Sequence, residues 1–412
     1  MIIYRNLLRC ALLLTTISSI AGPAAHAGPK NGVVELPPDP RFTGDTILSM
    51  TDTAGRRHQT WLMPELQRPL ESWIRKRLNP ISSLVAVDVT TGRILALVQG
   101  SPPARWGGAN HTALHTGFPA ASLFKTVVTA TAFEVAGLDP AEPIGLVGGC
   151  ADVHASGQWM RRDARTGPWH MTLRRAYGQS CNGFFAKITV NRIGFGPVLQ
   201  MARRFGWNDE PVPADISTPS NPISAPNPAT SSVHTIGRFA AGFGYVGTSA
   251  VHTAWNTTAI ARDGQAISLS LIRPPAGQPE ALPETRNIIK RETAIKIRKI
   301  MDTTVRGGTA SFAFRRNPHR RLRPLVGGKT GTLSGRHPDG ITTWFAGMMP
   351  LDEPEIVVVA VAMVEDFWKF KAAHLAAETF WLWQRHKKKL ARATPAAAGS
   401  YKTPPRARKK GG

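Results

Sequence analysis

Beyond its first 27 residues the sequence contains no apolar run long enough to cross a membrane, no internal repeat and no His-Glu-x-x-His motif. The first absence excludes a membrane-spanning helix in that part of the chain. The second excludes a repeat architecture, and the third argues against the zinc peptidases that carry this motif. With 412 residues, of which 42% are apolar, the chain can form one large domain or two small ones around a sizeable core.

Acidic residues are also scarce. The chain has 27 Asp and Glu against 51 Lys and Arg, a net charge of +24, and this excess favours anionic surroundings. For an exported chain these are phospholipid head groups or cell-wall polymers, and nucleic acid is not expected. Residues 386–412 are rich in Lys, Arg, Pro and Ala and contain no acid, which predicts a disordered basic tail. This tail either binds an anionic membrane or wall polymer or is simply solvated.

The N-terminus predicts export. Arg5 and Arg9 precede a short apolar stretch at 11–20, and the small residues of an Ala-His-Ala sequence follow it. This is the pattern of a secretory signal peptide over residues 1–27, cleaved after Ala27. An uncleaved anchor is the alternative, although the stretch is shorter than the ~20 residues of a spanning helix. We therefore expect the mature protein outside the cytoplasm, in the periplasm or cell envelope.

Two cysteines remain in the mature chain, Cys150 and Cys181. An even number of cysteines in an oxidising compartment permits a disulfide. Two buried free thiols are the alternative. The sequence leaves both open, because it does not supply the distance between the two side chains.

The pattern of apolar residues predicts strands near both ends of the chain and helices between them. Residues 28–75 show no clear periodicity and are expected to form a lead-in segment, ahead of a main domain at 76–385. The predicted strands lie at 83–89, 93–98, 325–332, 342–348 and 355–362, and the clearest helices at 248–262, 284–305 and 370–390. We therefore expect an α/β fold in which an antiparallel sheet is built from both chain ends, is flanked by helices and carries an inserted, mainly helical lobe.

One short stretch carries a chemical signal. Ser122 and Lys125 are three positions apart, on one face of a predicted helix. The residues that follow, up to Gly137, are apolar on nearly every side, so this helix is expected to be buried. A hydroxyl beside a lysine at the start of a buried helix suits a nucleophile and its base. We predict that Ser122 attacks a carbonyl and becomes acylated.

Two further motifs follow, Ser180-Cys181-Asn182 and Lys329-Thr330-Gly331. Together with the first motif, this ordered set resembles that of penicillin-binding proteins and class A β-lactamases. Other segments similar to penicillin-binding transpeptidase domains are the hairpin at 83–98 and the stretches at 242–248, 306–310 and 344–347. The resemblance covers roughly residues 76–385 and implies the penicillin-binding/β-lactamase-like fold.

The motif residues also have chemical reasons to occur together. Lys125 becomes a competent base for Ser122 if burial and a second cation lower its pKa, and Lys329 is the candidate for that cation. Ser180 can relay a proton between the lysine and the leaving amine. The amide of Asn182 can orient the backbone of a substrate.

The third motif is predicted to bind the substrate. Lys329 supplies positive charge for a carboxylate, and Thr330 and Thr332 add hydroxyl hydrogen bonds to it. Gly331 has no side chain, so a substrate can lie along the strand edge. The resemblance implies that the backbone N–H groups of Ser122 and Thr332 form the oxyanion hole.

The resemblance implies that peptidoglycan stem peptides ending in D-Ala-D-Ala are the substrate, and that β-lactams mimic them. The expected activity is a serine D,D-transpeptidase that forms an acyl-enzyme and cross-links the cell wall. A D,D-carboxypeptidase or endopeptidase is a near variant on the same site. A β-lactam or muropeptide receptor that stays acylated is an alternative from another class, as is a scaffold with idle motifs. We expect no cofactor and no metal.

Fast hydrolysis of β-lactams is not expected. A class A β-lactamase deacylates through a glutamate and a positioned water, and no glutamate between the second and third motifs stands in a Glu-x-x-Leu-Asn pattern. Asn182 also differs from the residue expected at that position in a class D enzyme. Cys181 stands where the corresponding motif of the family has aspartate, at a position that varies in the family.

Two other patterns are weaker. The segment 242–247 matches Gly-x-Gly-x-x-Gly, with Asp263 further on, but no β-branched strand precedes it, so a dinucleotide site is not expected. His111 and His115 have the spacing of metal ligands on a helix, but they lie in a glycine-rich loop without a third ligand.

Overall fold

The computed structural model describes residues 33–393 except 38, 78–80, 101–110, 148, 151–152, 154–168, 209, 245, 337–338 and 365–369. The predicted signal peptide and residues 394–412 of the predicted tail lie outside the described residues. None of the helices in the described part of the chain is both long and apolar enough to span a bilayer.

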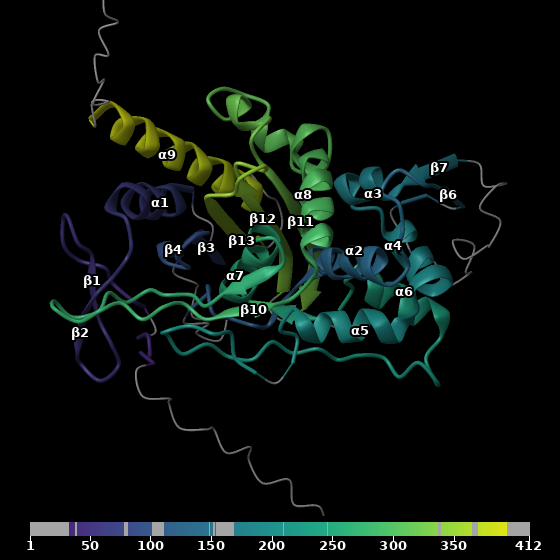
Figure 1. Ribbon diagram of the computed structural model, residues 1–412, viewed down its shortest axis with the longest axis horizontal. Helices are drawn as coiled ribbons and strands as arrows, with labels where there is room; N and C mark the ends of the chain where they lie inside the picture. The colour runs from purple at the N-terminus through teal and green to yellow at the C-terminus, as the bar shows by residue number, and fades with distance from the viewer. Residues whose placement is uncertain are drawn as a thin grey trace, which may run out of the picture.

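A five-stranded antiparallel sheet forms the centre of the molecule, in the order β11-β12-β13-β3-β4 (Figure 1). The strands are β3 (Ile81–Asp88), β4 (Ile94–Gln99), β11 (Gly327–Arg336), β12 (Asp339–Met349) and β13 (Ile356–Val364). Early and late segments of the chain therefore meet where β3 pairs with β13, as the sequence predicted. The sheet leaves β11 as an edge strand.

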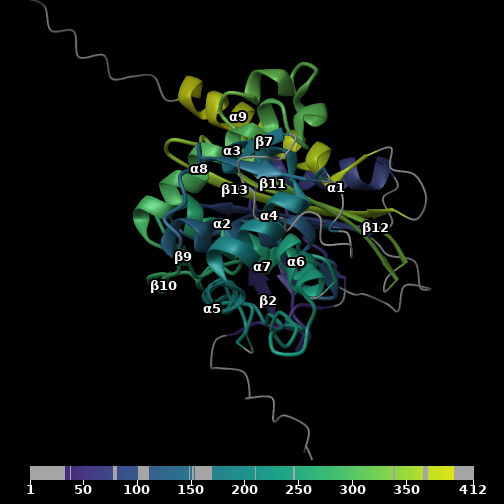
Figure 2. The same ribbon diagram turned by 90° about the vertical axis from the view of Figure 1, so that its right-hand side faces the viewer.

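Two hydrophobic cores cover the two faces of the sheet. On β13, Val359 and Val361 belong to the core beneath the helical lobe, whereas Val358 and Ala360 belong to the core beneath α1 and α9. Because both faces are buried, the strand is a continuous apolar run rather than an alternating one. The helix α1 (Pro64–Arg77) packs against α9 (Ala372–Ala393) on the second face (Figure 2).

The remaining elements lie mostly between the early and late strands of the sheet. The helices are α2 (Lys125–Glu134), α3 (Leu173–Gln179), α4 (Asn182–Ile188), α5 (Phe195–Arg204), α6 (Val233–Ala241), α7 (Ala250–Ala261) and α8 (Arg291–Arg306). Short turns are η2 (Ala121–Phe124), η4 (Thr189–Ile193), η5 (Ser311–Phe314) and η6 (His319–Leu322). Two-stranded pairs are β1 (Ser49–Thr51) with β2 (Arg57–Gln59), β5 (Phe118–Pro119) with β8 (Gly247–Thr248), β6 (Pro143–Leu146) with β7 (Trp169–Thr172), and β9 (Gln265–Ile267) with β10 (Thr285–Asn287). The predicted inserted helical lobe is therefore present.

Three boundaries differ from the sequence-based expectation. The lead-in segment contains α1, whose buried Leu66, Leu70 and Trp73 have helical spacing that the prolines around them obscured. Residues 285–287, predicted as helix, form β10 because they pair with β9, and α8 begins only at Arg291. The predicted helix at 370–390 and the predicted tail at 386–412 overlap, and the structure continues α9 to Ala393, since a solvent-exposed helix accommodates lysine and arginine readily.

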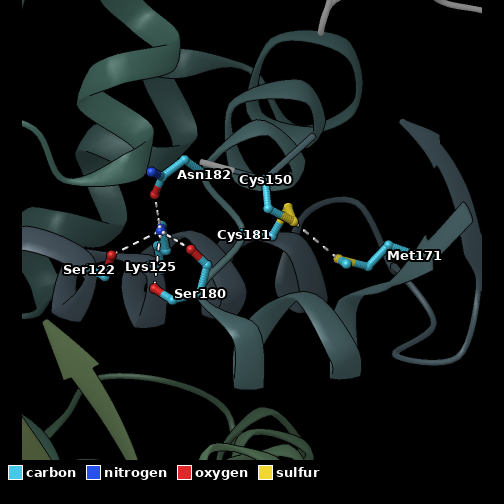
Figure 3. Close-up of a disulfide and its surroundings, with 7 residues drawn as sticks. All are labelled: Ser122, Lys125, Cys150, Met171, Ser180, Cys181 and Asn182. Atoms are coloured by element: carbon cyan, nitrogen blue, oxygen red, sulfur yellow. Dashed lines mark hydrogen bonds between the residues drawn. A yellow bond between two sulfur atoms is a disulfide. The ribbon is translucent and has the colours of Figure 1, made fainter. Parts of the chain in front are cut away.

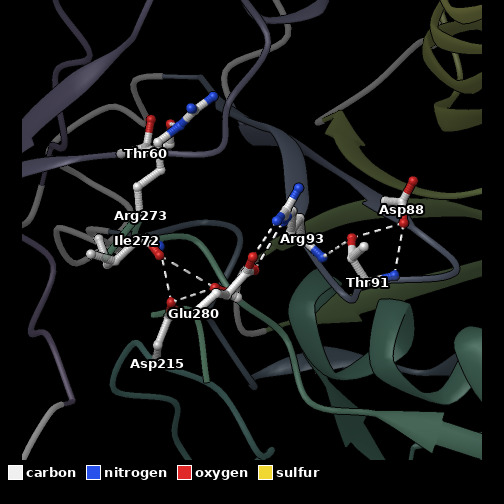
Figure 4. Close-up of polar contacts among 9 residues, drawn as sticks. Thr60, Asp88, Thr91, Arg93, Asp215, Ile272, Arg273 and Glu280 are labelled. Carbon is white, nitrogen blue, oxygen red and sulfur yellow. Dashed lines mark hydrogen bonds and ion pairs between the residues drawn. The ribbon is translucent and has the colours of Figure 1, made fainter. Parts of the chain in front are cut away.

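A polar cluster holds the loops around the β3–β4 turn (Figure 4). Asp88 Oδ1 accepts hydrogen bonds from the backbone N–H and the hydroxyl of Thr91, both at 2.8 Å. Arg93 forms an ion pair with Glu280, and Asp215 accepts hydrogen bonds from the backbone N–H groups of Leu271 and Ile272. Burial raises the pKa of the Asp215 carboxyl. All three acids therefore have structural partners.

Candidate active site

A cleft of about 320 Å³ opens beside the edge strand β11. It is bordered by η2, by the junction of α3 and α4, and by the end of α6. The predicted site residues that line it are Ser122, Ser180, Asn182, Thr330, Gly331 and Thr332. The three sequence motifs, which are far apart in the chain, therefore meet at one cleft. No aspartate or glutamate of the described residues lines it.

Ser122 lies in the 3₁₀ turn η2, and Lys125 is the first residue of α2. The helix predicted around both residues thus begins with a tighter turn. In a 3₁₀ turn, side chains three positions apart lie one above the other, and Lys125 Nζ donates a hydrogen bond to Ser122 Oγ at 2.9 Å. The residue before the serine, Ala121, has a φ of 48°, which is uncommon for a residue other than glycine.

Gly242, at the C-terminal end of α6, packs closely against the backbone of this turn. Its φ is 88°, and a Cβ built there would lie 1.9 Å from the carbonyl oxygen of Ala121. Any side chain at this position would collide with the backbone that carries Ser122. The preceding element is the helix α6 and not a strand, so the segment 242–247 lacks the context that a dinucleotide site requires.

We predict that Gly242→Ala slows acylation of the protein by a β-lactam at least about tenfold and destabilises the fold by about 1–3 kcal/mol, because η2 must move away from the new methyl group. Gly244→Ala is the matched control. Gly244 also has a positive φ, of 71°, but a Cβ there would meet no atom within 4 Å. The control should label within about twofold of wild type, since it adds only local backbone strain. Equal labelling rates for the two variants would contradict the role of Gly242, with thermal unfolding as the check on folding.

Lys125 lies beneath the cleft with its amine enclosed by the second motif (Figure 3). Its Nζ is 2.8 Å from the carbonyl oxygen of Ser180 and 3.2 Å from Ser180 Oγ, and it also donates to Asn182 Oδ1. The side chain is fully buried. Burial, and then the nearby charge of Lys329, hold the pKa of Lys125 well below its usual value. A buried lysine that loses its proton readily, and that contacts a serine hydroxyl, can act as a base.

Lys329 occupies the other side of Ser180. Its Nζ donates to Ser180 Oγ at 2.9 Å and to the carbonyl oxygen of Thr330 at 2.8 Å. Burial lowers the pKa of Lys329 to about 7. Ser180 Oγ is thus within hydrogen-bond distance of both lysine amines, which is the geometry that a proton relay needs.

The part of β11 that borders the cleft is closely packed. A Cβ at Gly331 would lie 3.2 Å from the carbonyl oxygen of Ala120 and 3.2 Å from Trp344 Cβ, so glycine keeps this stretch of the cleft open. Thr332 lies further along the same edge and is exposed. The third motif thus lies next to the turn that carries Ser122.

Several residues of the cleft were missed by the sequence-based prediction. The hydroxyl of Thr309 is hydrogen-bonded to that of Thr330, and the Thr309 backbone N–H donates to Gly178 O at 3.0 Å. The family-like stretch at 306–310 was the only signal for Thr309. The cleft is also lined by Phe243, Phe312, Trp344 and Lys371. Their loops and strands come from separate parts of the chain, so no local pattern could have grouped them.

Cys150 and Cys181 are joined by a disulfide (Figure 3). The structure therefore favours the first of the two alternatives that the sequence left open. By contrast, His111 and His115 are not part of a metal site: within the described residues no group of three or more His, Cys, Asp and Glu could hold a metal ion. His115 instead contacts the ring of Phe118 edge-on.

Comparison with known proteins identifies the family. The sequence profile of the penicillin binding protein transpeptidase domain matches residues 82–380. The chain belongs to this family. Because the matched segment includes all three motifs and most of the sheet, the family relation covers the site and not only the scaffold. No curated protein sequence matches the chain.

Solved structures of penicillin-binding proteins share the fold. Penicillin binding protein 3 from Mycobacterium tuberculosis, complexed with aztreonam, is 21% identical with a TM-score of 0.62, over 83% of this chain and 84% of that one. The D,D-transpeptidase domain of a peptidoglycan glycosyltransferase from Eggerthella lenta is 19% identical with a TM-score of 0.63, over 83% and 96%. An imipenem acyl-enzyme complex of penicillin-binding protein A from M. tuberculosis is 18% identical with a TM-score of 0.62, over 78% and 79%. The predicted fold class is confirmed.

Proposed function

We propose that this penicillin-binding transpeptidase domain is a serine D,D-transpeptidase of the cell envelope. The observation that carries the proposal is the fully buried amine of Lys125, hydrogen-bonded to Ser122 Oγ at 2.9 Å and enclosed by Ser180 and Asn182. Such an amine can accept the proton of the serine as its oxygen attacks a carbonyl. The predicted signal peptide supports a place outside the cytoplasm, where peptidoglycan is cross-linked.

In the acylation step, Ser122 Oγ forms a bond to the carbonyl carbon of the penultimate D-Ala of a stem peptide. The hydroxyl proton passes to neutral Lys125, and the amide C–N bond then breaks. Ser180, which contacts both lysines, returns the proton to the leaving D-Ala amine. The backbone N–H groups of Ser122 and Thr332 are proposed to stabilise the oxyanion. An amine of a second stem peptide then takes the acyl group and releases the serine.

The third motif would hold the substrate. The carboxylate of the terminal D-Ala carries one negative charge. Thr330 and Thr332 line the cleft and offer two hydroxyl donors, and Lys329, buried behind the cleft lining next to Ser180, offers a positive charge. β-Lactams present a carboxylate and an amide in a similar arrangement, so they are expected to acylate Ser122. The absence of a carboxylate among the described cleft residues supports slow deacylation, in contrast to a β-lactamase with its glutamate and water.

The rate of acylation should depend on pH through both lysines. Raising the pH deprotonates Lys125, whose pKa burial and the charge of Lys329 hold well below its usual value, and supplies the base. A further rise through about 7 removes the charge of Lys329, so the rate with benzylpenicillin should then fall. Benzylpenicillin methyl ester lacks the carboxylate and should show no such fall. If the acylation rates with benzylpenicillin and with its methyl ester fall in the same way at alkaline pH, the role of Lys329 is contradicted.

A stem pentapeptide with an amine acceptor tests the proposed activity. A cross-linked product is the expected result. Release of D-Ala with tetrapeptide alone would mean a carboxypeptidase, and a purified cross-linked muropeptide as substrate would reveal an endopeptidase. If none of these substrates is consumed while penicillin still labels the protein, the domain is a receptor and the transpeptidase proposal is wrong.

A further inference from the structure

The disulfide lies inside the second motif rather than beside it. Cys181 stands between Ser180 and Asn182, and its partner Cys150 comes from the loop that follows β6 (Figure 3). The backbone N–H of Asn182 donates to the carbonyl oxygen of Cys150 at 2.9 Å. The loop that carries Cys150 therefore contacts the motif through both a covalent bond and a backbone hydrogen bond.

The motif has a conformation that needs external support. Ser180 ends α3 with φ 57° and ψ 42°, in the left-handed region that residues other than glycine rarely adopt. Such a residue keeps this conformation only when its surroundings impose it. Two supports act through the next residue, Cys181: the hydrogen bond from its backbone N–H to Ala176 O at 2.9 Å and its bond to Cys150.

We propose that the Cys150–Cys181 disulfide is a positioning device for Ser180 and Asn182, so that acylation of Ser122 requires the oxidised protein. The proposal rests on the proposed function of this site. Without the bond, the loop of Cys150 separates from the motif, Ser180 relaxes from its left-handed conformation, and the contacts of Ser180 and Asn182 with Lys125 loosen. Lys125 is then less well placed to accept the hydroxyl proton of Ser122, although the hydrophobic core around it remains.

Reduction has a simple chemical balance. A dithiol supplies two electrons: one thiolate attacks Cys150 Sγ and displaces Cys181 as a thiolate, and the second thiol resolves the mixed disulfide. The products are two cysteine thiols and the oxidised dithiol. Attack at Cys150 is favoured because Cys150 is partly exposed whereas Cys181 is fully buried. A disulfide oxidant such as oxidised glutathione reverses the change.

The test compares one preparation in two redox states. The protein is reduced with dithiothreitol, freed of reductant by gel filtration, and its second-order rate constant of acylation by fluorescent penicillin is measured. We expect at least a tenfold fall relative to the oxidised protein, and recovery after treatment with oxidised glutathione. A reduced protein that acylates within twofold of the oxidised rate would overturn the proposal. Failure of the oxidised protein to label at all would instead refute the proposed function.

The double variant Cys150→Ala/Cys181→Ala separates positioning from folding. It should acylate as slowly as reduced wild type and should no longer respond to reductant. It should also need a higher pH for its base, because water that reaches Lys125 through the loosened motif relieves the burial that lowers the pKa of this amine. Thermal unfolding checks that it is folded at the assay temperature. A folded double variant with the wild-type rate and pH profile would show that the disulfide stabilises the chain only, against the proposal.

A second, independent feature is a surface of arginines and lysines over α9. Glu378 on α9 forms an ion pair with His319 of η6 at 3.0 Å. Residues seven, eleven and fourteen positions after Glu378 share its side of the helix. These are Arg385, Lys389 and Arg392, and all are exposed. The segment around His319, which contacts α9 through the His319–Glu378 pair, carries further exposed arginines: Arg315, Arg316, Arg320 and Arg321.

We call these seven residues the basic face. None of them forms an ion pair with an acid of the described residues. No aspartate or glutamate occurs between Asp302 and Asp339, or after Glu378, so no acid nearby in sequence could neutralise the face. Arg385 also lies over the partly exposed ring of Trp381. The apolar face of α9 is buried in the core, so the surface that this helix offers is cationic. Clustered exposed cations are attracted by the negative surface of a membrane that contains anionic lipids.

We infer that the basic face binds the anionic surface of a phospholipid membrane. The full mature chain should sediment with vesicles that contain phosphatidylglycerol and not with vesicles of phosphatidylcholine alone, and binding should weaken as salt rises. Arg320→Glu/Arg321→Glu/Lys389→Glu, with the tail intact, should lower the affinity at least tenfold. The control Arg203→Glu/Lys296→Glu/Lys299→Glu makes the same change of charge on exposed residues of α5 and α8 and should bind as wild type.

Two outcomes would overturn this inference. If the basic-face variant binds like wild type, the tail alone is responsible for membrane binding. If wild type ignores anionic vesicles but binds an anionic wall polymer, the partner is a polymer and not a membrane.

Discussion

Replacing Ser122 with alanine is expected to abolish covalent labelling by fluorescent penicillin. The hydroxyl is the only atom of this residue that can form the ester, and removal of a catalytic serine typically costs a thousandfold or more in rate, about the limit of detection in such an assay. Ser122 contributes little to the core, because its side chain lines the cleft. The variant should therefore unfold at a temperature close to that of wild type.

Ser334→Ala provides the control for this result. Ser334 lies on β11, is exposed and does not line the cleft. Its loss should leave labelling unchanged. Persistent labelling of Ser122→Ala, at a rate near that of Ser334→Ala, would mean that another nucleophile reacts.

Lys125→Met should reduce the acylation rate by about 10²–10⁴-fold, the usual contribution of a positioned general base. Methionine has nearly the length of lysine without its amine, so the helix α2 should pack as before. The change leaves the acceptors on Ser180 and Asn182 without their donor, at a cost of about 1–3 kcal/mol for each buried group. It also removes the need to bury an amine, which offsets part of that loss.

Lys187→Met is the matched control, because Lys187 is a second buried lysine of the helical lobe. Its Nζ donates to Gly145 O at 2.7 Å and it does not line the cleft. This variant should lose a comparable amount of stability but retain acylation. If both variants acylate equally fast, Lys125 is not the base, and if both lose activity equally, the effect is structural. Melting temperatures measured alongside the rates distinguish these cases.

The reactive residues of the site could be predicted from local sequence, whereas the contacts that hold them in place could not. The spacing of Ser122 and Lys125 needs only one turn of helix to bring the two side chains together, and the lysine of the third motif was recognised from the short motif Lys329-Thr330-Gly331 itself. Thr309 meets Thr330, and Gly242 meets Ala121, only because separate segments fold against each other. Nothing local in the sequence records such contacts. The same applies to the disulfide, whose two cysteines are 31 positions apart.

The fold errors have similar physical causes. In α1, two prolines interrupt the helical spacing of the apolar residues, so the sequence did not predict this helix. Packing against α9 buries those apolar residues and stabilises the helix. The segment 285–287 directly precedes the helical pattern of α8 in sequence, but its pairing with β9 makes it a strand, because strand pairing depends on tertiary context. At the end of α9, a dense group of lysines and arginines looked like a disordered tail, although these residues have good helix propensity.

The central claim is that Ser122 becomes acylated in this cleft. Incubation with benzylpenicillin, followed by intact mass measurement and tryptic mapping, tests it most directly. The predicted result is one adduct per chain, located on Ser122 in the tryptic peptide that ends at Lys125. No adduct, or an adduct on any other residue, would contradict the claim.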